Sequence, residues 1–131
     1  MSNKTATPLL NTRLQGQVVL VTGAGSGIGH AAALAFSRSG ATVALAGRRT
    51  APLETVAQQI TAAGGHAEVF SVDLADADAP AHLVGAVVAR FGRLDAAFNN
   101  AGTAPYAPLE QVTAEDFDSV FATNAVSYTH L

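Results

Sequence analysis

Short apolar runs recur along the chain and are separated by longer stretches with helical periodicity. Residues 18–21 form a continuous run of Val and Leu, which is typical of a strand buried on both faces of a parallel sheet. Residues 42–46, 67–72 and 94–98 are similarly apolar and predict three further strands.

The three stretches between these strands predict helices, because apolar residues recur in them at intervals of three and four. Thr50 is a suitable N-cap for the second helix, with Pro52 in its first turn, and Pro80 opens the third helix. Each helix is expected to end at a glycine, in order Gly40, Gly64 and Gly92. The apolar positions are Ile28, Ala31, Ala32, Ala35 and Phe36 in the first helix, Leu53, Val56, Ala57 and Ile60 in the second, and Leu83, Val84, Val87, Val88 and Phe91 in the third.

This alternation places a helical crossover between every two consecutive strands. Crossovers of this kind connect parallel strands with a right-handed turn, so the sequence predicts an α/β fold with an open, doubly wound parallel sheet of about four strands. Residues 1–15 are polar and aperiodic and predict a flexible N-terminal arm, so the folded domain is expected to begin near Gly16.

Composition narrows the classes of function. The 131 residues are 49% hydrophobic and 13% charged, which is enough apolar material for one folded domain. A net charge of -3 and scattered basic residues disfavour nucleic-acid binding. No run approaches the roughly 20 apolar residues of a membrane span, and the N-terminus lacks the apolar centre of a signal peptide. The absence of Cys fits a cytoplasmic protein, and the four His residues show no metal-ligand spacing.

A glycine-rich turn follows the first strand, with the sequence Thr22-Gly23-Ala24-Gly25-Ser26-Gly27-Ile28-Gly29. It is not a strict G-x-G-x-x-G, because Ile stands at position 28, and no Gly-Lys-Ser/Thr follows to make a P-loop. Glycines let the backbone leave the strand tightly and let N–H groups approach a phosphate, and the N-terminus of the next helix adds donors and partial positive charge. The turn therefore predicts a site for the pyrophosphate of a dinucleotide.

The pattern Thr22-Gly23-x-x-x-Gly27-Ile28-Gly29 resembles the cofactor signature of the short-chain dehydrogenase/reductase (SDR) family. Asp73-Leu74, Asn99-Asn100-Ala101-Gly102 and Asn124 agree with further family segments in order and spacing, and the resemblance covers roughly residues 14–126. It implies a Rossmann-type fold, an adenine contact by Asp73 and its neighbour, and a cofactor lining by the Asn-Asn-Ala-Gly element. The cofactor-binding residues that it implies are Gly23, Ser26, Gly27, Ile28, Gly29, Asp73, Leu74, Asn100, Ala101 and Gly102.

Asn124 falls on the apolar face of a helix that Thr113 is expected to cap. Phe117, Val120 and Phe121 precede it at helical spacing, so its amide is expected to point inward. A buried polar group without a partner costs about 1–3 kcal/mol, so the amide serves either the backbone or a site. The resemblance implies that Asn124 is a catalytic residue, which holds a water molecule in a proton relay.

The end of the second strand bears on the choice of cofactor. NAD-preferring enzymes place an Asp or Glu here to bind the ribose 2′-hydroxyl, but this chain has Gly47, followed by Arg48 and Arg49. A guanidinium matches a 2′-phosphate in charge and geometry, so both arginines are assigned to cofactor binding. The alternative is two solvated arginines at a helix entrance. We expect NADP(H) to be preferred and leave NAD(H) open as a second cofactor.

The resemblance also calls for a catalytic Ser and a Tyr-x-x-x-Lys pair, which this chain does not contain. Its only Lys is Lys4, and Tyr106 is followed four positions later by Glu110. We expect the missing groups to lie beyond Leu131, in a chain that is truncated and inactive on its own.

The domain organisation expected on this basis is a truncated Rossmann dinucleotide-binding domain over residues 16–125 and a non-native tail over residues 126–131. The tail resembles the translation of a sequencing adaptor more than the family's helix. In the Rossmann strand order 3-2-1-4, residues 94–98 would form an edge strand that is mostly apolar, with Asp95 as its only charge and no proline, which favours self-association.

Three functions remain open at this point. The first is an SDR oxidoreductase, which transfers hydride between a nicotinamide and an alcohol or carbonyl substrate. The second is a non-catalytic NADP(H)-binding module, and a downstream Tyr-x-x-x-Lys would separate the two. The third is a nucleotide-sugar epimerase or reductase of the same fold, whose glycine turn is usually one residue shorter. The expected partners are a small-molecule alcohol or carbonyl and, for the full-length protein, further copies of itself, with no nucleic acid and no membrane.

Overall fold

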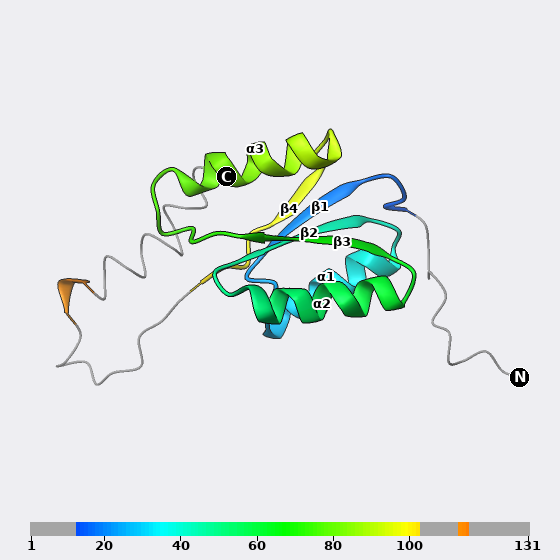
Figure 1. Ribbon diagram of the computed structural model, residues 1–131, viewed down its shortest axis with the longest axis horizontal. Coiled ribbons are helices and arrows are strands. Elements are labelled where there is room, and N and C mark those ends of the chain that lie inside the picture. The colour runs from blue at the N-terminus through cyan, green and yellow to red at the C-terminus, as the bar shows by residue number, and fades with distance from the viewer. Residues whose placement is uncertain (1–12, 103–112, 116–131) are drawn as a thin grey trace, which may run out of the picture.

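The computed structural model describes residues 13–102 and 113–115 of the protein (Figure 1). Strands and helices alternate through the first of these ranges. The elements are β1 (Val18–Thr22), α1 (Gly27–Arg38), β2 (Thr42–Gly47), α2 (Thr50–Ala62), β3 (His66–Ser71), α3 (Ala79–Phe91) and β4 (Ala96–Phe98).

The four strands form one parallel sheet in the order β3-β2-β1-β4. β1 lies in the middle, where Val19 pairs with Val43 of β2 on one side and with Ala96 of β4 on the other. The predicted doubly wound Rossmann-type sheet is thus confirmed. β4 lies at the edge of the sheet that the described residues form, as the strand order 3-2-1-4 requires.

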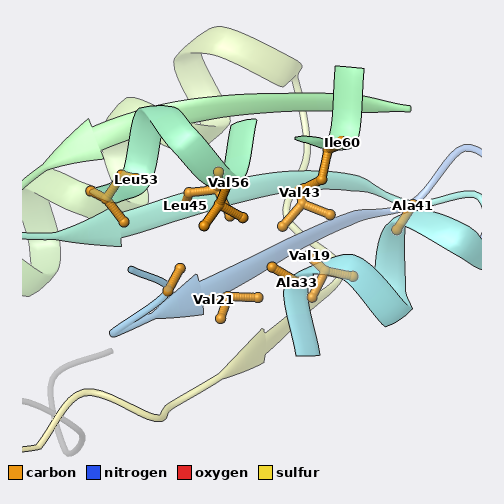
Figure 2. Packing of buried hydrophobic residues seen from close by; sticks show 10 residues of the cluster. Val19, Val21, Ala33, Ala41, Val43, Leu45, Leu53, Val56 and Ile60 are labelled. Carbon is orange, nitrogen blue, oxygen red and sulfur yellow. The ribbon is translucent and has the colours of Figure 1, made fainter. Parts of the chain in front are cut away.

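Helices cover both faces of the sheet. Figure 1 shows α1 and α2 together on one face and α3 alone on the other. Successive side chains of a strand point to opposite faces of the sheet. The strands therefore contribute side chains to two hydrophobic cores, one on each face of the sheet. The core under α1 and α2, drawn in Figure 2, contains Val19, Val21, Val43, Leu45, Leu53, Val56 and Ile60. The core under α3 contains Val18, Leu20, Ala44, Ala46, Leu83 and Val87.

The buried face of α1 differs from the one its apolar residues predict. Gly29, Ala33 and Ser37 are buried, whereas Ile28 is 71% exposed. The predicted helix is present, but three of its five apolar positions, namely Ile28, Ala31 and Ala35, are exposed and do not form its buried face. The reason is tertiary: α1 lies so close to the glycine turn that only a residue without a side chain fits at Gly29, and this sets the helix rotation.

Other details of the helices and strands differ slightly from those predicted from the sequence. Arg49 is the N-cap of α2, so the expected capping role of Thr50, the first helical residue, was wrong. β4 begins at Ala96 instead of residue 94, and Leu94, which precedes the strand, packs against the core under α3. Val88, expected on the inner face of α3, is 41% exposed. Gly40, Gly64 and Gly92 have positive φ at the helix ends, as predicted.

The carboxylate of Asp95 holds the segment that leads into β4 through three hydrogen bonds. Asp95 accepts hydrogen bonds from Nε of Arg93 at 2.8 Å, from Nη2 of Arg93 at 2.7 Å and from the backbone N–H of Val18 at 2.8 Å. These donors, the guanidinium first, hold the pKa of Asp95 below its ordinary value. The hydrogen bond from Val18 links the residue before β4 to the first residue of β1.

Candidate functional site

The glycine turn joins the end of β1 to the start of α1. Its Ser26 is the N-cap of α1, with extended backbone angles of φ -159° and ψ 164°, and its side chain makes no capping hydrogen bond. The first turn of α1 contains no acidic residue. Neither a capping side chain nor a carboxylate of the first turn therefore competes for the first N–H groups of the helix, and the expected binding of a pyrophosphate there stays a prediction.

Three backbone segments meet at this turn without room for side chains. Gly23 has φ +65°, and a Cβ there would lie 3.1 Å from both Cα of Ala101 and Nδ2 of Asn100. A Cβ at Gly29 would overlap the carbonyl oxygen of Gly23 and lie 2.7 Å from Nδ2 of Asn100. The structure thus brings together the predicted turn and the predicted Asn-Asn-Ala-Gly element, although they are far apart in the sequence.

Thr22 connects these segments through its buried hydroxyl. Oγ1 accepts the backbone N–H groups of Asn100 and Ala101, each at 2.9 Å, and donates to the carbonyl of Phe98 at 3.5 Å. The side-chain amide of Asn100 donates to the carbonyl of Gly23 at 3.4 Å. The sequence analysis included Thr22 in the glycine-rich motif but assigned no role to it. The sequence feature that could have indicated a role is a hydroxyl residue at the end of an otherwise apolar strand.

A pocket of about 140 Å³ opens between the glycine turn and the end of β2. It brings the turn together with Arg48 and Arg49, as the assignment of both to one cofactor requires. No carboxylate is among the lining residues, which are Gly23, Gly25, Ser26, Gly47, Arg48, Arg49, Pro52 and Leu53. Sequence reasoning did not anticipate that the first turn of α2 would form a wall of this pocket.

Asp73 and Leu74 follow β3 and do not line this pocket. Asp73 is exposed, and its Oδ1 accepts the backbone N–H of Ala75 at 3.0 Å, which closes a turn. Leu74 is buried and packs in the core under α3. Gly27 and Ile28 are exposed at the start of α1, beside the lining residue Ser26.

Gly102 is exposed just after Ala101. Asn124, the predicted catalytic residue, lies outside the described residues.

Two properties of the described residues bear on other functions. Within residues 13–102 and 113–115, no group of three or more His, Asp or Glu side chains is arranged to hold a metal ion. In the same ranges, no helix has the length and apolar character needed to cross a bilayer.

A parallel sheet with a glycine turn at the carboxyl end of its central strand, next to the point where the strand order reverses, defines the Rossmann class of dinucleotide-binding folds. The family model described as short chain dehydrogenase matches residues 17–131. The chain belongs to this short-chain dehydrogenase family.

Curated relatives agree with this assignment. The chain is 42% identical over 112 residues to D-threitol dehydrogenase of Mycolicibacterium smegmatis, an alignment that covers 86% of this chain and 43% of that protein. It is 45% identical over 116 residues to versicolorin reductase 1 of Aspergillus parasiticus, covering 87% of this chain and 44% of the relative. The chain thus spans less than half the length of these relatives.

Solved structures give the same result. A metagenomic short-chain oxidoreductase in complex with NADP has a TM-score of 0.85 and 39% identity, over 90% of this chain and 54% of that one. A short chain dehydrogenase from Burkholderia cenocepacia in complex with NADP has a TM-score of 0.85 and 35% identity, over 90% of this chain and 49% of that one.

Proposed function

We propose that this chain is the cofactor-binding part of an NADP(H)-dependent oxidoreductase that acts on an alcohol or carbonyl compound. The observation that carries the proposal is the pocket between the glycine turn and Arg48 and Arg49, which has guanidinium groups and no carboxylate in its lining. A carboxylate at the end of β2 would repel a 2′-phosphate, whereas an arginine attracts it through charge-assisted hydrogen bonds.

Each segment of the site has a role in this proposal. The uncapped N-terminus of α1, from Gly27 to Gly29, receives the pyrophosphate, and Ser26 supplies a free hydroxyl beside it. Arg48 and Arg49 hold the 2′-phosphate. Asp73 and Leu74 flank the adenine, and Asn100 to Gly102 line the cofactor on the β4 side.

The bound nicotinamide supplies a hydride acceptor or donor at its C4 atom. The chain's own contribution to proton transfer is assigned to Asn124, which would hold a water molecule of the proton relay. The Tyr-Lys pair that the family resemblance calls for is not in these 131 residues, whose only lysine is Lys4. Turnover is therefore proposed for the complete protein.

The two similar structures that contain NADP support the choice of cofactor, because they share this fold at 39% and 35% identity. The proposal includes a cytoplasmic location, consistent with a chain that has no cysteine. It also includes a small-molecule substrate and self-assembly of the complete protein.

The test is a fluorescence titration of the chain with NADPH and with NADH. Arg48→Asp is expected to weaken NADPH binding by roughly tenfold or more and to raise the relative affinity for NADH, because attraction is replaced by repulsion. Arg38→Asp is the control, since it makes the same charge change at the other end of α1, about 18 Å along a helix of this length.

Equal affinity of the unmutated chain for the two cofactors would overturn the assignment of the arginines. Binding of neither cofactor would overturn the proposed function itself. Binding of NADPH by the complete protein without any turnover would favour a nucleotide-sensing module.

A further inference from the structure

Gly25 differs from the nearby Gly23 and Gly27 in the kind of constraint that acts on it. Gly23 and Gly27 have φ values of +65° and +58°, a region that side chains rarely adopt, whereas Gly25 has no positive φ. A Cβ at Gly25 would instead lie 3.0 Å from Cβ of Pro52, on the opposite side of the pocket. Space, and not backbone conformation, is therefore the constraint at this position, since a Cβ would fit only if its neighbour shifted by a few tenths of an ångström.

The Pro52 side of this contact is anchored. Pro52 lies in the first turn of α2, where its ring fixes φ. The next residue, Leu53, is 1% exposed in the core under α1 and α2, and its side chain lies 3.5 Å from the position of a Cβ at Gly47. The first turn of α2 cannot move away from the glycine turn without pulling Leu53 out of a close-packed core.

Gly25, Pro52, Arg48 and Arg49 line the same pocket. A side chain at position 25 would therefore fill part of the space beside the arginines or push the glycine turn away from them. We propose that Gly25 and Pro52 form a spacer pair whose contact sets the pocket width, so that a 2′-phosphorylated adenosine fits against Arg48 and Arg49. This inference rests on the proposed function and adds two specificity-determining positions to it.

The experiment measures the dissociation constants of NADPH and NADH for variants of the whole 131-residue chain, together with the thermal unfolding of each variant without cofactor. Gly25→Ala is expected to raise the Kd for NADPH by about fivefold or more, a typical effect of one added methyl group in a tightly packed site. The Kd for NADH is expected to change by less than about twofold, because the 2′-hydroxyl needs less room than a phosphate.

The rescue variant is Gly25→Ala combined with Pro52→Gly, which removes the Cβ that the new methyl group meets. It is expected to bind NADPH as tightly as the Pro52→Gly single variant. Gly85→Ala is the matched control, since it makes the same chemical change in α3, where a Cβ would have nothing within 4 Å. It is expected to leave both dissociation constants unchanged.

The outcomes separate the two proposals. Failure of the unmutated chain to bind NADPH would overturn the proposed function and this inference with it. Normal NADPH binding by both the unmutated chain and Gly25→Ala would overturn the inference alone. If Gly25→Ala also unfolds at lower temperature, the double variant is expected to recover both folding and the preference for NADPH. Recovery of folding without that preference would show that the pair is only structural.

Discussion

Replacing Gly29 by Ala tests whether the close approach of α1 to the glycine turn is as tight as the structure shows. The added Cβ would overlap the carbonyl oxygen of Gly23 and lie 2.8 Å from its carbonyl carbon. It would also lie 2.7 Å from Nδ2 of Asn100, which donates to that same carbonyl. Two of these atoms belong to the backbone, so relief requires movement of the helix or the turn.

The cost follows from the rigidity of these neighbours. Overpacking of a well-packed site typically costs 1–3 kcal/mol, and contact with backbone atoms favours the upper end, about 3 kcal/mol. In a folded region of this size, each 1 kcal/mol lowers the unfolding midpoint by roughly 4–8 °C, so a loss of about 12–24 °C is expected. NADPH binding is expected to fall as well, because the N–H donors at the start of α1 are displaced.

The assay is thermal unfolding followed by circular dichroism, with Gly85→Ala as the comparison. Gly85 is exposed within α3 and its added Cβ would meet nothing, so the same substitution there is expected to stabilise the chain by about 0.5–1 kcal/mol. Opposite signs for the two variants are the expected result. An unfolding midpoint for Gly29→Ala that equals that of the unmutated chain would refute the close packing of helix and turn.

Three further outcomes are expected. The 131-residue chain should not oxidise NADPH with ketone substrates, because Lys4 is its only lysine and no Tyr-Lys pair can supply the proton; sustained turnover would contradict this. Asp95→Asn should be less stable than the unmutated chain at pH 7. Arg93 and the N–H of Val18 lower the pKa of Asp95 in the folded state. The contribution of Asp95 to stability is therefore full above the ordinary Asp pKa of about 3.9 and is lost as pH falls through the lower folded value. The difference between the unfolding midpoints of the two proteins should accordingly shrink as pH falls below about 3.9. Strand β4 lies at the edge of the sheet in the described part of the chain, with Ala96 and Ala97 exposed. It should make the chain self-associate in size-exclusion chromatography, and a sharp monomer peak would argue against this.

The order of the elements and the sheet topology could be predicted because they depend on local patterns. Residues 18–21 are apolar without interruption, and each helical stretch ends at a glycine that has positive φ in the structure. The alternation of strand and helix leaves few topologies open, since parallel crossovers are right-handed. The rotation of α1 could not be predicted in this way, because Gly29 is buried by a contact with Gly23 across the turn.

In the candidate site, too, features that depend on the local sequence could be predicted, and features that depend on contacts between distant residues could not. The glycine turn and the two arginines could be assigned from residue type and position, because phosphate binding needs specific local chemistry. The bridging role of Thr22 and the contact of Gly25 with Pro52 depend on which distant residues meet, and nothing in the local sequence specifies these distances. Asp73 is exposed and its Oδ1 accepts the N–H of Ala75, and its expected contact with the adenine stays a prediction.

The hydrogen bonds of the Thr22 hydroxyl also bear on the order in which the parts of the candidate site form during synthesis of the chain. All residues that line the pocket lie between Gly23 and Leu53, so this part of the chain is complete early. Asn100, which Thr22 binds, follows 78 residues after it, and closing a longer loop costs more chain entropy. We therefore expect pairing of β1 with β2 to precede pairing of β1 with β4. A nascent chain released between these two events would have the residues that line the pocket before Thr22 can bind Asn100 and Ala101.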